Sequence, residues 1–162
     1  MKSLLRSGGA LAACVVFSGL LSSVAAARTI PATAGRTANG ANATCYIWDS
    51  LAVGPGGAQL GLRNNCAGVV SAWTFGLTID SPVAHTVIVR VKETGAGSVA
   101  CHTTTVNPNG SSVGNFGAIS APVAGWQDLI MGTPAVPAGG TVYVTCAISG
   151  PNTAKILSVD WF

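Results

Sequence analysis

Charged residues are scarce in this chain, at 8% of its 162 residues, with eight Lys and Arg against five Asp and Glu. Lys2 and Arg6 lie in the N-terminal segment, which leaves six of the eight basic residues for the rest of the chain. Binding to nucleic acid depends on clusters of Lys and Arg that neutralise phosphates. Since Arg28 and Arg36 also lie ahead of the predicted domain, we expect no basic patch on the folded part and no nucleic-acid partner.

Metal-binding spacings and helical patterns are also missing. The sequence holds no C-x-x-C pair, and its two histidines, His85 and His102, stand apart, so neither a metal site nor another cofactor is expected. Beyond residue 27, no stretch repeats its apolar residues with the period of an α-helix. Gly, Pro or polar residues interrupt every apolar run there, which excludes a membrane-spanning helix from the mature chain.

The segment 1–27 has the features of a secretory signal peptide. Lys2 and Arg6 precede an apolar stretch from Gly9 to Leu21, and the segment closes with three small residues that end at Ala27. A short basic start, a short apolar region and a small-residue exit are the three parts of such a signal. We therefore predict cleavage near Ala27 and a mature protein that is secreted, periplasmic or held at the cell surface.

Cysteine usage agrees with export. Cys14 falls within the predicted signal peptide, and four cysteines remain beyond it: Cys45, Cys66, Cys101 and Cys146. In an oxidising compartment such residues form disulfides. Four cysteines allow three pairings. We expect the sequential pairs Cys45–Cys66 and Cys101–Cys146, although the sequence alone leaves the connectivity open.

From residue 44 onward, apolar and polar residues alternate with a period of two, which is typical of half-buried antiparallel strands. The strongest predicted strands cover 73–79, 86–92, 142–148 and 157–161, and weaker ones cover 45–49, 58–63, 99–105, 112–116 and 127–131. The apolar faces place Trp73, Trp161, Cys101 and Cys146 toward the core. Clusters of Gly, Pro, Asn and Asp between the strands predict turns.

This pattern predicts an all-β fold with a single domain at 44–162. A run of about eight or nine short strands separated by turns is typical of an antiparallel β-sandwich, here stapled by two disulfides. The segment 28–43 is small, polar and without period, so we expect a flexible leader there.

Catalytic patterns are weak. The stretch Gly110 to Gly114 matches G-x-S-x-G, but a nucleophile elbow needs a strand-to-helix turn and a histidine downstream of the serine. Both histidines precede Ser112, and the match follows a turn sequence. The acidic residues Asp49, Asp80, Glu93, Asp128 and Asp160 each stand alone in the sequence. We therefore expect no enzyme, unless the fold brings His85 and His102 together or joins one of them to an acid.

The aromatic residues are better candidates for a binding site. Trp126 lies in a Pro- and Gly-rich stretch and precedes Gln127 and Asp128. An exposed loop tryptophan can stack on a sugar ring while nearby amides and acids bind hydroxyls. Trp48 and Tyr46 share one face of a predicted strand and form a second candidate. For each of these aromatics the alternative is packing within the sandwich.

Two sequons for N-glycosylation occur, at Asn42 and Asn109. They matter only in a host that glycosylates secreted proteins, and the sequence does not identify its host. Both lie where we expect exposed segments.

Around the last two cysteines, the chain resembles a loose group of small, uncharacterised secreted bacterial proteins that have a signal peptide and a disulfide-linked β-sandwich. The resemblance rests on four segments: Thr86 to Val91, Val99 to Cys101, Thr141 to Ile148, and Lys155 to Trp161. Members often carry a cysteine inside the strand that here spans residues 72–75, whereas this chain has Cys66 ahead of it. The resemblance implies the secreted β-sandwich and no particular activity.

These observations favour a secreted, non-catalytic domain that binds a surface glycan or another envelope component. The alternative is a structural subunit of an extracellular coat or filament, because 49% of the residues are apolar and few are charged. Self-association would then be expected through exposed strand edges. A hydrolase is a distant third interpretation.

Overall fold

The computed structural model describes residues 27–162 apart from residues 39, 55–56, 80, 121–122 and 152. The predicted signal peptide lies, but for its last residue, outside the described residues. The regular structure of the described part is strand, apart from two short 3₁₀ helices, η1 at Ala32–Ala34 and η2 at Gly40–Cys45. The prediction of an all-β fold is confirmed. None of the helices among these residues is long and apolar enough to span a membrane.

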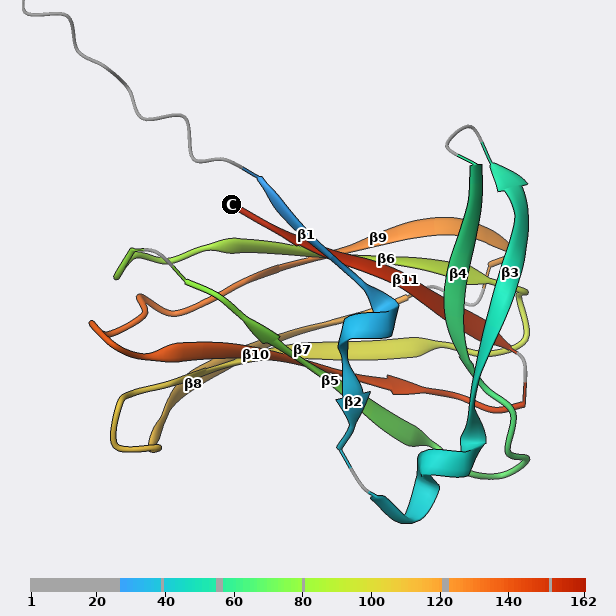
Figure 1. Cartoon of the computed structure of the whole chain (residues 1–162), viewed down its shortest axis with the longest axis horizontal. Helices are drawn as coiled ribbons and strands as arrows, with labels where there is room; N and C mark the ends of the chain where they lie inside the picture. Colours follow the sequence, from blue (N-terminus) through green and yellow to red (C-terminus); the bar gives the residue numbers. More distant parts are fainter. Residues whose placement is uncertain (1–26, 39, 55–56, 80, 121–122, 152) are drawn as a thin grey trace, which may run out of the picture.

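Two antiparallel sheets form the sandwich (Figure 1). Sheet A has the strand order β3-β4-β11-β6-β9, and β1 pairs with β11 beside this path. Its strands are β1 Arg28–Pro31, β3 Tyr46–Gly54, β4 Gly57–Asn64, β6 Thr86–Glu93, β9 Gly125–Gly132 and β11 Ala154–Trp161.

Sheet B has the strand order β2-β5-β10-β7-β8. Its strands are β2 Arg36–Thr37, β5 Ser71–Leu77, β7 Val99–Val106, β8 Ser112–Ile119 and β10 Thr141–Ile148. Each of the nine predicted strands is present with bounds shifted by a few residues, and the prediction of a β-sandwich is confirmed. The two strands that the sequence did not predict, β1 and β2, are the shortest.

The core lies between the sheets and follows the predicted alternation. The inward residues of β6, β10 and β11 are fully or almost fully buried, including Val87, Val89, Val91, Val142, Val144, Ile148, Val159 and Trp161. Trp73 and Phe75 of β5 complete this core from sheet B. Burial of apolar surface contributes about 25 cal/mol per Å², so this layer is the main source of folding free energy.

The N-terminal segment, for which the sequence predicts a flexible leader, contains the two short strands β1 and β2. β1 pairs with β11 from Arg28 opposite Trp161 to Pro31 opposite Ser158, and β2 pairs with β5. Ala32, between them, is fully buried in the core. The segment therefore crosses from one sheet to the other, and backbone pairing holds it in place although its side chains show no apolar period.

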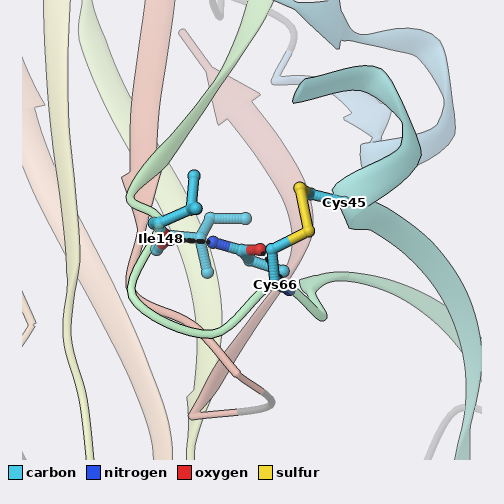
Figure 2. The surroundings of a disulfide bond; sticks show 5 residues. Cys45, Cys66 and Ile148 are labelled. Atoms are coloured by element: carbon cyan, nitrogen blue, oxygen red, sulfur yellow. Dashed lines mark hydrogen bonds between the residues drawn. A yellow bond between two sulfur atoms is a disulfide. The ribbon is translucent and has the colours of Figure 1, made fainter. Parts of the chain in front are cut away.

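Both predicted disulfides are present. Cys101 and Cys146 lie directly opposite each other on β7 and β10, with both side chains in the core. Cys45, at the end of η2, is joined to Cys66, just after β4 (Figure 2). Two disulfides indicate an oxidising environment such as the extracellular space.

A buried asparagine, Asn64, lies beside the Cys45–Cys66 bridge and joins the two sheets. The side-chain amide of Asn64, at the end of β4, donates to the carbonyl oxygen of Ile148 in β10 at 3.0 Å (Figure 2). Its Oδ1 accepts the backbone N–H of Cys66 at 3.0 Å. A buried amide is stable only when its donors and acceptors are satisfied, so Asn64 fixes the sheet spacing at this end of the sandwich.

Candidate functional site

Trp126 lies on a strand rather than on the predicted loop. It is the second residue of β9, after Gly125, whose φ of 133° is a conformation that glycine adopts readily. Along β9 the exposed residues Trp126, Asp128 and Ile130 alternate with Leu129 and Met131, which are buried. The sequence placed the start of this strand two residues too late, at 127 instead of 125, because Pro and Gly ahead of Trp126 resemble a loop.

The register of β6 against β9 places Arg90 opposite Asp128 and Lys92 opposite Trp126. These four residues form the β6–β9 patch on the outer face of sheet A. Arg90 Nε donates to Asp128 Oδ1 at 3.0 Å, and its Nη2 donates to Oδ2 at 3.3 Å. The hydrogen bond and the negative charge of Asp128 raise the pKa of Arg90 above its usual value. The two N–H···O contacts give the pair a bidentate geometry.

Trp126 is 46% exposed, and the ammonium group of Lys92 lies 5.3 Å from the centroid of its ring. A cation at that distance from an indole is attracted by the ring's electron density. An open pocket of about 210 Å³ is lined by Arg90, Trp126, Gln127 and Asp128. The patch thus offers an aromatic surface beside a carboxylate and a guanidinium that retain hydrogen-bonding capacity.

Gln127 contributes to the pocket wall, and its side-chain amide donates to the carbonyl oxygen of Val123 at 3.0 Å. This bond ties the start of β9 to the segment that precedes it. Three of the five predicted binding residues, Trp126, Gln127 and Asp128, therefore line one pocket.

The other two predicted binding residues lie on β3, at the far end of the order of sheet A. The rings of Tyr46 and Trp48 contact Trp73 of sheet B, with centroid distances of 4.8 Å and 5.6 Å. Trp48 is 41% exposed, whereas Trp73 is only 7% exposed. This aromatic cluster closes the space between β3 and β5, so Tyr46 and Trp48 do not join Trp126.

His85 precedes a strand of sheet A, whereas His102 lies on a strand of sheet B. His85, just before β6, has its Nε2 3.2 Å from the carbonyl oxygen of Ser81, while its backbone N–H donates to Thr133. His102 is exposed on β7, where its register partners are Thr145 and Gly117. Ser112 begins β8, so the strand-to-helix turn of a nucleophile elbow is not formed there.

The sequons and the candidate metal ligands are further features of the sequence. Asn109 is exposed in the turn before β8, where its Oδ1 accepts from Ser111. The side chain of Asn42 lies outside the described residues. Among the described residues, no three of His, Cys, Asp and Glu gather as metal ligands would.

Arg90 and Lys92 were not predicted as site residues. The alternation along 86–92 already placed both on the outer face of their strand, but the sequence did not reveal which strand lies beside them. The pairing of β6 with β9 supplies that information.

The outer face of sheet B carries the aromatic residue Tyr143 of β10. Its ring lies against Gly76 of the neighbouring strand, where an added Cβ would lie 3.7 Å from the ring. Around it stand small hydroxyl side chains, including the hydrogen-bonded pair Thr74 and Thr145 at 3.1 Å. Tyr143 is thus a partly exposed aromatic on the face opposite the β6–β9 patch.

No protein-family model matches the chain, and no curated protein matches its sequence. Solved structures share its fold. A family 35 carbohydrate-binding module from Clostridium thermocellum has a TM-score of 0.55 at 14% identity, over 85% of this chain and 98% of that one. A carbohydrate-binding module of Cellvibrio mixtus lichenase 5A, solved with cellotriose, has a TM-score of 0.53 at 13% identity, over 83% and 95%.

Larger proteins contain the same fold as one part. The isomalto-dextranase of Arthrobacter globiformis T6, solved with panose, has a TM-score of 0.60 at 11% identity and covers 83% of this chain. This chain spans only 23% of that protein, and 19% of the bacteriophage CBA120 tailspike domain, which has a TM-score of 0.57 at 8% identity. At such identities the likeness establishes the shared β-sandwich fold.

Proposed function

We propose that this protein is a secreted, non-catalytic β-sandwich domain that binds a surface or envelope glycan at the β6–β9 patch. The observation that carries the proposal is Trp126, a half-exposed indole beside the bidentate pair of Arg90 and Asp128 in an open pocket. A sugar ring presents an apolar face to an indole and hydroxyls to charged hydrogen-bonding groups. Two structures of similar fold and similar length are carbohydrate-binding modules, which supports the same function.

The two charged groups have capacity left for a ligand. Arg90 uses two of its five N–H donors on Asp128 in the described contacts, and each carboxylate oxygen can accept a second hydrogen bond. Since the bidentate ion pair orients both groups, a sugar would meet donors and acceptors that are already positioned. Preorganisation of this kind lowers the entropic cost of binding.

Retention on insoluble polysaccharides and on intact cell-envelope preparations tests the proposal. We expect the wild type to be retained on at least one of these, and Trp126→Ala to lose that retention. Tyr143→Ala is the matched control, because it removes an aromatic from the opposite outer face. Thermal unfolding of each variant separates loss of binding from loss of fold.

Retention that survives Trp126→Ala and disappears in Tyr143→Ala would place the site on sheet B and contradict the assignment. Trp48→Ala should retain binding, because that side chain packs on Trp73. If the wild type binds none of the polysaccharides or envelope preparations, the glycan-binding function is wrong.

A second candidate function, a subunit of an extracellular coat or filament, is favoured by one observation. Exposed apolar side chains lie on β8, on β9 and between them: Val113, Phe116, Ile119, Val123 and Ile130. β8 and β9 each end the strand order of their sheet and lie next to each other. An exposed apolar edge of this kind is a template for pairing with another chain.

Sedimentation velocity across a wide concentration range tests this candidate. Assembly through this edge predicts oligomers that grow with concentration and that Ile119→Lys together with Ile130→Lys prevents. A protein that stays monomeric at all concentrations would contradict it.

A further inference from the structure

Three cations from three strands lie side by side on the outer face of sheet A. The register places Lys92 of β6 opposite Lys155 of β11, and Lys155 opposite Arg63 of β4. On the other side of Lys92, its partner in β9 is Trp126. Lys92, Lys155 and Arg63 form what we call the cation row, which runs across the strands and ends at the tryptophan.

All three side chains of the cation row point to the same face. Each is partly exposed, and each stands between two buried neighbours on its strand, such as Ala154 and Ile156 around Lys155. In a β-strand such alternation puts the partly exposed residues on the outer face of the sheet. The row is therefore a surface feature of the folded protein, built from residues that are far apart in the sequence.

Like charges directly opposite each other on neighbouring strands destabilise a sheet. The chain places two such pairs in succession, although it has few charged residues in total. A loss of stability of this kind is tolerated where a binding site requires the charges that cause it. From the sequence we expected no basic patch, because these cations are isolated along the chain; the pairing of the strands places them side by side.

We propose that the cation row makes the site selective for an acidic glycan, a linear chain of uronic-acid units that crosses the strands from Trp126 toward Arg63. This inference rests on the proposed glycan-binding function and names its ligand class. One unit stacks on Trp126 while the carboxylates of the following units meet Lys92, Lys155 and Arg63. Neighbouring strands lie about 4.8 Å apart, a spacing comparable to the length of one pyranose unit in a linear chain.

The cations need not be unpaired for this role. Lys155 and Arg63 also interact within the protein. The potentials of adjacent charges add over a surface, and a row of three attracts an extended polyanion more strongly than any one of them. Lys92 additionally lies against the Trp126 ring, so it joins the aromatic and the charged parts of the site.

Affinity electrophoresis with polygalacturonate and alginate tests the proposal, and methyl-esterified polygalacturonate serves as the uncharged counterpart with the same backbone. We expect binding to the two acidic polymers, weaker binding to the ester, and affinity that falls as salt rises. Lys155→Gln should weaken binding to the acidic polymers at least about fivefold, and Lys155→Arg should restore it. Arg36→Gln, which removes an exposed cation from β2 of sheet B, is the matched control and should change nothing.

The outcomes separate this proposal from the function on which it rests. The protein could bind methyl-esterified polygalacturonate as tightly as polygalacturonate and lose binding to both polymers in Trp126→Ala. In that case the glycan site stands and its selectivity for acidic chains is wrong. If Lys155→Gln and Lys92→Gln both leave binding to polygalacturonate unchanged, the cation row is not part of the site. Failure to bind either acidic polymer, or tighter binding to single-stranded DNA than to both, overturns the proposal.

Discussion

The indole Nε1 of Trp73 donates a hydrogen bond of 3.1 Å to the carbonyl oxygen of Ala32. Both groups are buried, and the bond joins the N-terminal segment to β5 of sheet B. Gly35 lies so close that an added Cβ would overlap the same indole and the ring of Phe75. The segment 28–43, expected from the sequence to be a flexible leader, is thus joined to the core through Ala32.

Gly35→Ala should therefore destabilise the protein. Overpacking of this kind typically costs about 1–3 kcal/mol, because the indole or the segment must move to accommodate the methyl group. The free energy of unfolding in urea measures the effect. Gly40→Ala is the control, since an added Cβ there meets no atom within 4 Å. Equal stability of the two variants would show that residues 28–38 do not dock on Trp73.

Removing Cys101–Cys146 should destabilise the protein more than removing Cys45–Cys66. The two bridges close loops of 45 and 21 residues, and in the chain-entropy model this difference alone is worth about 0.7 kcal/mol. Cys101 and Cys146 are also both buried in the core, so replacing them by Ala leaves a cavity. Urea unfolding of the two double-alanine variants gives the order, and the reverse order would contradict the prediction.

Glu93 is a buried carboxyl, only 2% exposed, at the end of β6. Burial raises its pKa above the usual value, although the hydrogen bonds from Ser120 Oγ and from the backbone of Val99 oppose the shift. Among the described residues, its Oε2 has no hydrogen-bond partner. The folded state therefore holds a proton on Glu93 more tightly than the unfolded state does.

From this difference in proton binding we expect Glu93 to make the protein less stable as pH rises. The stabilisation of the folded state by the protonated Glu93 is fully present below the unfolded pKa of about 4.3. This stabilisation is lost as pH rises through the higher pKa of the folded state. Glu93→Gln keeps the shape without the ionisation, so its stability relative to wild type should increase over that pH range. Unfolding free energies of both proteins at several pH values check this. A difference that does not change with pH would contradict the raised pKa.

The Arg90–Asp128 pair should contribute little to folding. Both side chains are nearly half exposed, at 45% and 43%, and solvent screens such pairs to a coupling below about 1 kcal/mol. A double-mutant cycle with Arg90→Gln and Asp128→Asn measures the coupling. The same variants should weaken glycan binding, because the oriented pair forms part of the pocket. Coupling well above that value, with unchanged binding, would make the pair structural.

Much of the fold was accessible from sequence because burial imposes a period of two on each strand. Trp73 and Trp161 were placed in the core from this period alone, and both are buried. β1 and β2 were missed because their residues are held by backbone pairing, with little apolar surface to leave a pattern. Cys101 and Cys146 were recognised as inward-facing, which favours their bridge.

The candidate site was harder to predict from the sequence, since it depends on which strands are neighbours in the sheet. Trp126 and Asp128 are close in sequence and were predicted together as binding residues. Arg90 and Lys92 face them only because β6 pairs with β9, a register fixed by long-range contacts. Lys155 and Arg63 illustrate the same limit, because no local pattern relates two cations on strands β11 and β4.

The pairing of β1 with β11 also decides how the domain responds to mechanical force. Arg28 lies opposite Trp161, so the start of β1 and the end of β11 are at the same end of an antiparallel pair (Figure 1). Tension applied at these two points loads the hydrogen bonds between the strands one after another. A pull on both ends therefore unzips β1 first, at low force, and next strains the bond between Ala32 and Trp73. A domain anchored at both ends would yield at this strand, while the disulfide-linked strands of sheet B stay folded.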